Sequence, residues 1–285
     1  MKKWTRRSFL KSSLGVLLSA AGAGAGGKYY AEEVEPRWLE VNSYKISHKL
    51  IPRGFGGIKI VQFSDTHIGF QFQLNDLKAA VKKISSLQPD MIFFTGDLMD
   101  APNEYAHQED IIPVLSSLNP PLGKFCVYGN HDHGGYGTDI YENIMKQAGF
   151  TVLKNDYRIV KLLNGDSICI SGIDEPMLGR PDLNRALDRA EGRYHINLSH
   201  APDLADDISA FPVHLQLSGH SHGGQVQIPF AGALVKPPFA EKYIEGFYDI
   251  GSVKLYVNRG LGTTRLPYRV LSRPEITIFE LERKH

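Results

Sequence analysis

The sequence predicts an α/β fold, with one large domain occupying most of its 285 residues. Short apolar runs rich in β-branched and aromatic residues alternate with segments whose apolar residues recur every three to four positions, which is the spacing of an amphipathic helix. The composition agrees, since 42% hydrophobic and 22% charged residues are ordinary for a globular chain that buries a sizeable core. Several apolar runs are followed by polar clusters, and open α/β sheets bind ligands beyond the carboxyl ends of their strands.

Residues 1–27 are predicted to be a twin-arginine export signal. They carry the pattern Thr-Arg-Arg-Ser-Phe-Leu-Lys at positions 5–11, then a weakly apolar stretch rich in Gly and Ala, and no acidic residue. This arrangement is typical of bacterial export signals, and a disordered basic terminus is the alternative. We expect the twin-arginine export machinery as a partner and a place in the cell envelope: the cell wall, the periplasm or the outer-membrane face. An uncut signal would leave the protein anchored by its N-terminus.

The rest of the chain is mildly acidic. Without the five basic residues of the first segment, 27 basic residues stand against 31 acidic ones, a net charge of −4. Nonspecific nucleic-acid binding requires a basic face, so we expect no nucleic-acid partner. Cys126 and Cys169 lie inside apolar, strand-like runs, and we interpret them as buried small hydrophobes rather than as a disulfide.

Residues 28–57 are predicted to be a polar N-terminal segment with one strand at 39–46, and residues 58–285 to be the main domain. The domain begins with a β-rich run at 58–63. A helix follows at 74–87, where the apolar positions recur at helical spacing.

The elements further along the chain continue the alternation. Asn164-Gly165 predicts a tight turn that joins two strands, 158–163 and 167–173. The other predicted strands are 91–95, 125–128, 194–198, 214–217, 225–228, 254–257 and 275–279, and the other predicted helices are 109–118, 140–148 and 184–190.

Five clusters of Asp, Asn and His carry the chemistry of this chain. Each begins just beyond the carboxyl end of a predicted strand, so residues distant in sequence are expected to converge. The clusters are Asp65-x-His67, Gly96-Asp97-x-x-Asp100, Gly129-Asn130-His131-Asp132, Ser199-His200 and Gly219-His220-Ser221-His222. Any one of them alone would be an ordinary polar turn. Together they offer enough carboxylate, amide and imidazole ligands for two ions, and this donor set suits Mn, Zn or Fe better than Mg or Ca.

In residue type and order, the five clusters resemble the calcineurin-like metallophosphoesterase superfamily over about residues 58–225. With the export signal, the chain looks like the exported bacterial branch of that superfamily. The resemblance implies two packed mixed β-sheets flanked by helices, and a pair of divalent metal ions. It implies that Asp97 bridges both ions. The ligands of the first ion would be Asp65, His67 and His222, and those of the second Asn130, His200 and His220.

Two further residues of the third cluster are candidate catalytic residues. We expect His131 to protonate the leaving group or to stabilise the transition state, because it adjoins the ligand Asn130. Asp132 is expected to orient His131 or another imidazole ring. Asp100 is expected to hold the Asp97 loop by hydrogen bonds rather than to touch metal.

These features predict a dinuclear metallophosphoesterase. The favoured bond is a phosphodiester or pyrophosphate in a small-molecule or lipid-linked cell-envelope substrate, cleaved by a hydroxide that bridges the two ions. A phosphomonoesterase is one alternative, and a noncatalytic metal-dependent scaffold is another.

Two segments outside the clusters suggest substrate contacts. Residues 228–239 are apolar but interrupted by three prolines and a glycine, so we interpret them as an apolar lip for acyl chains or a membrane surface, with a core-packed loop as the alternative. One or two of four nearby arginines are candidate phosphate contacts, with a solvated surface as the alternative. These are Arg259, Arg265, Arg269 and Arg273.

Overall fold

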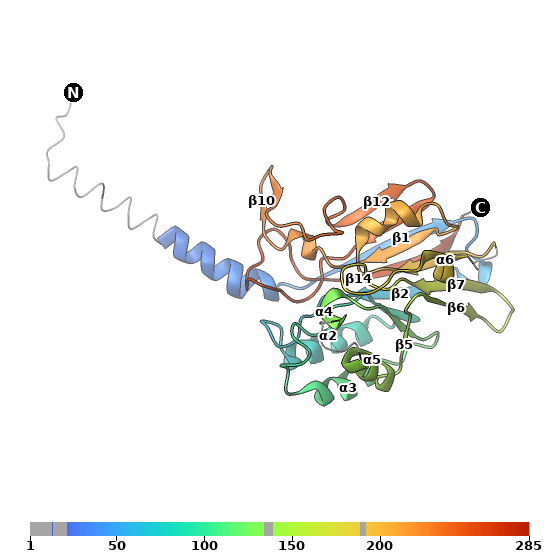
Figure 1. Ribbon diagram of the computed structural model, residues 1–285, viewed down its shortest axis with the longest axis horizontal. Helices are drawn as coiled ribbons and strands as arrows, with labels where there is room; N and C mark the ends of the chain where they lie inside the picture. Colours follow the sequence, from blue (N-terminus) through green and yellow to red (C-terminus); the bar gives the residue numbers. More distant parts are fainter. Residues whose placement is uncertain (1–12, 14–21, 134–138, 189–191, 285) are drawn as a thin grey trace, which may run out of the picture.

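The computed structural model describes residues 13, 22–133, 139–188 and 192–284, so the predicted twin-arginine pattern at 5–11 and more than half of the weakly apolar stretch after it lie outside the described residues. Two six-stranded β-sheets pack face to face, and helices cover the outer face of each (Figure 1). The predicted fold class, two mixed sheets flanked by helices, is confirmed. Within the described residues, no helix combines the length and the apolar character that crossing a bilayer requires.

The first sheet has the strand order β1-β14-β2-β3-β4-β5. Its strands are β1 (Glu40–His48), β14 (Glu275–Arg283), β2 (Lys59–Phe63), β3 (Met91–Phe94), β4 (Lys124–Cys126) and β5 (Phe150–Val152). β14 runs parallel to β1 and antiparallel to β2, and the other neighbours are parallel. The N-terminal segment therefore contributes an edge strand to the sheet of the main domain.

The second sheet has the order β12-β13-β9-β8-β7-β6. Its strands are β6 (Asp156–Lys161), β7 (Ser167–Gly172), β8 (His195–Leu198), β9 (Leu215–Ser218), β13 (Val253–Val257) and β12 (Gly246–Ile250). The predicted hairpin around Asn164-Gly165 is the antiparallel pair β6–β7. The strand predicted at 225–228 joins neither sheet: β10 (Gln227–Ile228) pairs with β11 (Gly232–Ala233) in a separate small hairpin.

Three helices cover the first sheet, namely α2 (Leu74–Ser86), α3 (Gln108–Ser116) and α5 (Asp139–Gln147). α2 begins with a capping box in which Gln73 and Asp76 exchange hydrogen bonds, and it buries Leu77, Val81 and Ile84. The shorter α6 (Leu183–Leu187) and α7 (Ala205–Ile208) pack beside the second sheet. The remaining helical turns are η1 (Tyr30–Val34), η2 (Glu35–Arg37), η3 (Arg53–Phe55), α4 (Asn130–His133), η4 (Pro202–Leu204) and η5 (His222–Gly224).

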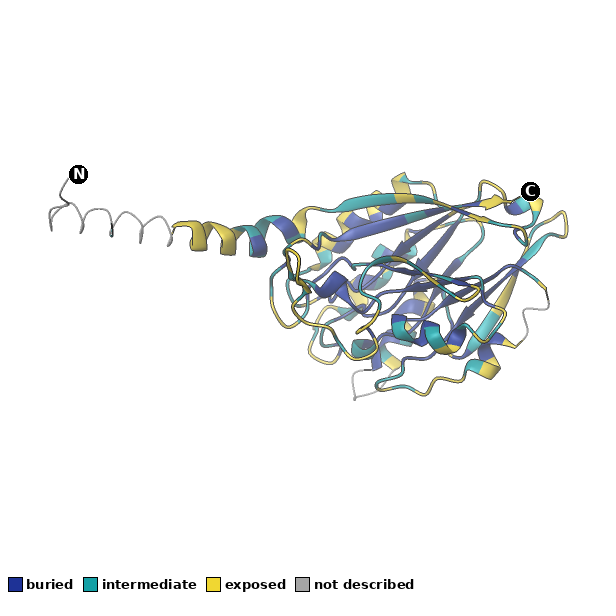
Figure 2. Cartoon of the chain, turned by 90° about the horizontal axis from the view of Figure 1, so that it is seen from above, coloured by how far each residue is buried: buried dark blue, intermediate teal, exposed yellow. Residues whose placement is uncertain are grey.

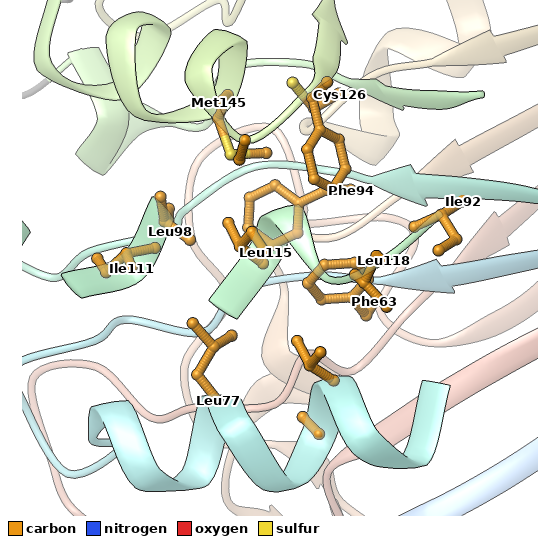
Figure 3. Packing of buried hydrophobic residues seen from close by; sticks show 14 of the residues in the cluster. Phe63, Leu77, Ile92, Phe94, Leu98, Ile111, Leu115, Leu118, Cys126 and Met145 are labelled. Atoms are coloured by element: carbon orange, nitrogen blue, oxygen red, sulfur yellow. The ribbon is translucent and has the colours of Figure 1, made fainter. Parts of the chain in front are cut away.

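Alternating strand residues fill two apolar layers. Val61 and Phe63 face the helices, where they pack with Leu77 and other residues shown in Figure 3. Ile60 faces the opposite layer, between the two sheets, with Ile196. The central strands of both sheets are accordingly buried, whereas the edge strands β1, β6 and β12 are partly exposed and the helix at residues 22–29 is exposed (Figure 2). Cys126 and Cys169 are free and buried, as predicted.

Candidate metal centre

Asp97 lies at the meeting point of the clusters. It follows β3, is 2% exposed, and its Oδ2 lies 3.4 Å from Nε2 of His67 and 3.3 Å from Nε2 of His200. Its Oδ1 accepts a hydrogen bond from the backbone N–H of His131 at 2.8 Å. One carboxylate oxygen thus lies close to His67, a candidate ligand of the first ion, and to His200, a candidate ligand of the second, which is the position that a bridging ligand needs.

The first group of candidate ligands is Asp65, His67 and His222. Their ligand atoms lie within 4.8 Å of one another, and all three side chains are buried. Nε2 of His67 and Nε2 of His222 are 3.0 Å apart, and the latter is 3.5 Å from Oδ1 of Asp65. This is the set expected for one ion.

The second group combines Asp97 with His200 and His220, whose ligand atoms also lie within 4.8 Å of one another. Asn130 lines the same pocket, and its Oδ1 is buried without a hydrogen-bond partner in the described structure. Nε2 of His200 is likewise buried and unpartnered there. Such orphaned acceptors are rare in folded proteins unless a cation or water satisfies them.

The second ring nitrogen of each histidine shows which atom is free to bind. Nδ1 of His67 lies 3.0 Å from Oδ1 of Asp100, and Nδ1 of His200 lies 2.7 Å from the Thr95 carbonyl. Since an oxygen acceptor requires a donor, both Nδ1 atoms carry protons, and Nε2 is the atom of each ring that faces the centre and can bind an ion.

The same reasoning applies to the last cluster. Nδ1 of His222 faces the Gly262 carbonyl at 3.3 Å, and Nε2 of His220 donates to the Pro238 carbonyl at 2.8 Å. His222 therefore offers Nε2 and His220 offers Nδ1. The centre holds four imidazole nitrogens, two carboxylates and an amide oxygen, a donor set that fits a pair of divalent cations.

The pKa shifts reflect this excess of acceptors. Burial opposes the ionisation of Asp97, but the charges of His200 and His131 outweigh it and hold the pKa of Asp97 well below its usual range. Burial likewise disfavours the cation of His200, but Asp97 outweighs it and raises the pKa of His200 to about 10. Burial lowers the pKa of His220 to about 3 and raises the pKa of Asp65. In the cation-free protein, a proton on His200 supplies the positive charge that an ion would bring.

Tight turns position the ligands, and several have left-handed backbones that side-chain-bearing residues rarely adopt. They are Asp65 (φ 49°), His67 (φ 44°), Asp97 (φ 60°), His220 (φ 70°) and His222 (φ 51°). Glycines make room: a Cβ at Gly129 would overlap Asp97, and one at Gly219 would overlap Asp65 and Ser64. The motif glycines therefore permit the carboxylates to approach neighbouring loops.

Asp132 has a different task from the one predicted. Its carboxylate accepts hydrogen bonds from the backbone N–H groups of Asp97 (2.7 Å), Leu98 (2.9 Å) and Gly129 (2.8 Å). It therefore ties the Asp97 and Gly129 loops together instead of orienting an imidazole. Burial and the charge of Asp97 raise the pKa of Asp132, although the three backbone N–H donors act to lower it.

Asp100 and His131 form the edge of the centre. Oδ1 of Asp100 accepts from Nδ1 of His67 and, at 2.9 Å, from the hydroxyl of Thr264, so Asp100 orients a ligand ring rather than the Asp97 loop. Nδ1 of His131 donates to the Asp100 carbonyl at 2.6 Å. Burial disfavours the protonated form of this ring, but Asp97 and Asp100 outweigh burial and raise the pKa of His131.

The four arginines near the C-terminus differ in role. Arg265 lines the pocket at the metal centre. Arg269 is fully buried, and its guanidinium donates to the carbonyls of Ser272, Arg259 and Gly262. Arg259 and Arg273 pair with Glu40. The solvated-surface alternative is thus wrong for Arg269. Arg265 remains a candidate phosphate contact because it lines the pocket.

A pocket of about 210 Å³ opens beside these ligands. One side consists of Asp97, Asn130, His131 and the His220–His222 turn. The other side is apolar or basic and comes from the predicted lip and from the loop after β13; it comprises Leu234, Val235, Pro237, Thr264, Arg265 and Leu266. The pocket thus combines carboxylate and imidazole ligands with apolar and basic side chains, which suit an apolar or anionic substituent.

A family model for calcineurin-like phosphoesterases matches residues 58–224. The chain is 50% identical over 283 residues to the metallophosphoesterase YkuE of Bacillus subtilis, covering 99% of each chain. It is 26% identical to phosphodiesterase YaeI of Escherichia coli, over 97% of this chain and 99% of that one. It is 28% identical to the UDP-2,3-diacylglucosamine pyrophosphatase LpxG of Chlamydia trachomatis, over 87% of this chain and 91% of that one.

The family match begins at the residue before β2 and ends just after the His220–His222 turn, so it spans all five clusters that converge on Asp97. The match to YkuE extends the relationship over nearly the whole chain. On both grounds, this protein belongs to the calcineurin-like phosphoesterase family.

Proposed function

We propose that this protein hydrolyses a phosphodiester or pyrophosphate bond of a cell-envelope substrate, using two divalent cations (Mn, Zn or Fe). The observation that carries the proposal is the position of Asp97, whose Oδ2 lies within 3.4 Å of Nε2 of both His67 and His200. Such a carboxylate is suited to bridge two ions about 3.5–4 Å apart.

The bound ions would supply a hydroxide near neutral pH and stabilise charge on the phosphoryl oxygens. Asp65, His67 and His222 would hold one ion, and Asn130, His200 and His220 the other. The chain itself supplies the acid: Nδ1 of His131 is tied to the Asp100 carbonyl, so its Nε2 is the atom that delivers a proton to the leaving oxygen. The raised pKa of His131 keeps that proton in place near neutrality.

The pocket and the relatives support the proposed type of bond. Phosphodiesters and pyrophosphates have a substituent on each side of the reacting phosphorus, and the apolar and basic wall offers a place for the second one. The names of YaeI and LpxG, a phosphodiesterase and a pyrophosphatase, support the same assignment. The export-signal pattern of residues 1–27 supports a substrate in the envelope.

Hydrolysis of model substrates tests the proposal. Purified full-length protein loaded with Mn²⁺ is expected to cleave a bis-aryl phosphodiester faster than the corresponding aryl monoester. Asp97→Asn is expected to abolish cleavage and to lower the bound metal. His107→Gln, a change at an exposed histidine outside the centre, is the matched control and is expected to retain full activity. A metal-loaded protein without activity on diesters, pyrophosphates or monoesters would indicate a scaffold instead.

A further inference from the structure

A cluster of exposed apolar side chains adjoins the metal pocket. Of the thirteen large apolar side chains that are exposed in the described residues, seven fall in two short segments, 228–239 and 266–271. We call six of these seven, all except Phe239, the apolar rim: Ile228, Phe230, Leu234, Val235, Leu266 and Leu271. The core-packed alternative for residues 228–239 is therefore wrong, and the predicted lip is exposed.

The two segments form one surface. The backbone N–H of Gln227 donates to the Val270 carbonyl at 2.9 Å, and that of Val270 donates to Gln225 at 3.0 Å. The Gln225 side chain donates to the Leu266 carbonyl at 2.8 Å. The β10–β11 hairpin and the 264–271 loop are thus hydrogen-bonded side by side. The hairpin projects from the body (Figure 1). Its turn contains Phe230, which is fully exposed.

This surface is continuous with the metal pocket. Leu234, Val235 and Leu266 belong both to the rim and to the pocket wall. The carbonyl of Pro238, in the same segment, accepts the hydrogen bond from the ligand His220. Whatever covers the rim therefore lies directly at the pocket mouth.

The charge of the rim favours an anionic partner. Neither residues 225–239 nor residues 260–273 contain an acidic residue, although the body as a whole is mildly acidic. Lys236 and Arg265 lie within these segments. Apolar side chains flanked by basic ones, without acids, are the composition of surfaces that bind anionic membranes.

The N-terminal segment reaches the body at the same place. The backbone N–H of Arg269 donates to the Ala31 carbonyl at 2.8 Å, and the Gln71 side chain donates to the carbonyls of Glu32 and Pro267. Residues 22–29 extend outward from this point as an exposed helix, and the hairpin lies at the same end of the molecule (Figure 1). The sequence that precedes this helix contains the apolar run of the predicted export signal.

We propose that the apolar rim docks onto an anionic lipid bilayer, with Phe230 among the acyl chains and the metal pocket opening at the membrane surface. Phe230 and Leu271 expose apolar side chains to solvent, which is unfavourable. Their backbones have φ of 67° and 55°, which side-chain-bearing residues rarely adopt, so both positions are also strained. The docking needs no turnover, so it can be tested independently of the proposed function.

An environment-sensitive fluorophore placed on the rim tests the proposal. In the full-length chain, Phe230→Cys is labelled with a nitrobenzoxadiazole group. Leu163→Cys is the matched control, because Leu163 is as exposed as Phe230 (111% and 110%) but lies in the turn between β6 and β7, outside the rim. Both native cysteines are buried, and burial raises their pKa values, so they do not compete for the label in the folded protein. Vesicles of phosphatidylglycerol and phosphatidylethanolamine are the membrane, and vesicles of phosphatidylcholine alone are the uncharged comparison.

On the anionic vesicles, the label at position 230 is expected to shift to the blue and to brighten several-fold, while the label at 163 does not change. The response is expected to be weaker on phosphatidylcholine and to fall with added salt. An unchanged label at 230 on protein that co-sediments with vesicles would overturn the proposal, since the N-terminal segment alone would then hold the membrane. An equal response to monomeric short-chain phosphatidylglycerol, or to raised protein concentration without lipid, would also overturn it, in favour of a single-lipid site or of self-association.

Discussion

Nε2 of His67 and Nε2 of His222 face each other at 3.0 Å, and the Nδ1 atom of each ring already donates to an oxygen. Two lone pairs at this distance repel unless a positive charge lies between or beside them. The rings are held there by the Asp100 carboxylate and the Gly262 carbonyl. These contacts hold the two rings in place, and ion binding removes the repulsion between their lone pairs.

Metal binding is therefore expected to stabilise the protein strongly. A cation at 1,000 times its Kd adds about 4 kcal/mol of unfolding free energy per site, or a rise of about 8 to 16 °C in Tm for a chain of this size. Scanning calorimetry of the chelated and the Mn²⁺-loaded protein measures the rise. His67→Gln is expected to lose at least half of it, and equal Tm values with and without Mn²⁺ in the native protein would contradict the assignment of the centre.

Cation affinity is expected to increase with pH. His200 has its pKa raised from 6.5 to about 10 by Asp97, so in the cation-free protein this pairing contributes stability that is fully present below about pH 6.5 and is lost as the pH rises through about 10. A cation must displace the proton, and the apparent affinity for Mn²⁺ therefore rises about tenfold per pH unit in that window. Competition with a chelator of known affinity at pH 7 and pH 8 measures the slope. A flat profile would mean that His200 is neutral before the ion arrives.

Asp132→Ala is expected to lower stability rather than chemistry alone. The change leaves the amides of Asp97, Leu98 and Gly129 buried without their acceptor, at about 1–3 kcal/mol each, so the unfolding free energy should fall by about 3 kcal/mol or more. Urea denaturation measures the loss. The control is Asp188→Ala at an exposed aspartate, expected within about 0.5 kcal/mol of the native protein. An Asp132→Ala protein of native stability but without activity would restore the catalytic role predicted for Asp132.

Gly219→Ala is expected to damage the first ion site selectively. The added Cβ would overlap Oδ2 of Asp65 and Oγ of Ser64, so the Asp65 carboxylate has to move. Gly56→Ala is the matched control, because Gly56 is exposed and its φ of −63° is ordinary for any residue. Elemental analysis should find about one ion fewer per chain in Gly219→Ala than in Gly56→Ala. Equal metal content in the two variants would show that the loop absorbs the methyl group.

His131→Gln is expected to slow hydrolysis in a way that depends on the leaving group. General acids contribute about 10² to 10⁴ in rate, and poor leaving groups need the proton most. We therefore expect a large loss of kcat for an alkyl ester, a small loss for a nitrophenyl ester, and unchanged metal content. A uniform loss across leaving groups would assign His131 to phosphoryl binding instead of proton transfer.

The sequence is sufficient to predict the strands that carry ligands. β2, β3, β8 and β9 are almost wholly buried, and each contains two or more of the large apolar residues typical of buried strands. β5 and β12 are absent from the prediction for two different reasons. β5 has only three residues, and β12 is a partly exposed edge strand whose mixed side chains do not differ from those of a loop.

Within the site, the sequence predicts ligands better than it predicts their supports. Asp65 and His220 are identifiable because metal binding restricts the residue type. The carbonyls of Gly262 and Pro238, which orient His222 and His220, have no such signature, since every residue has a carbonyl. The role predicted for Asp132 rests on its adjacency to His131 in the sequence. Its hydrogen-bond partners are instead the backbone N–H groups of Asp97 and Leu98, which only the folded loops bring near.

The position of β14 has a consequence for biosynthesis. Among the described residues this strand comes last in sequence order, yet it is inserted between β1 and β2, the first two described strands. Until the ribosome has released residues 275–283, both of those strands keep a bare hydrogen-bonding edge, which is a hazard for aggregation. The first sheet therefore closes only after residues 275–283 have left the ribosome, and chains that terminate before them cannot close it at all.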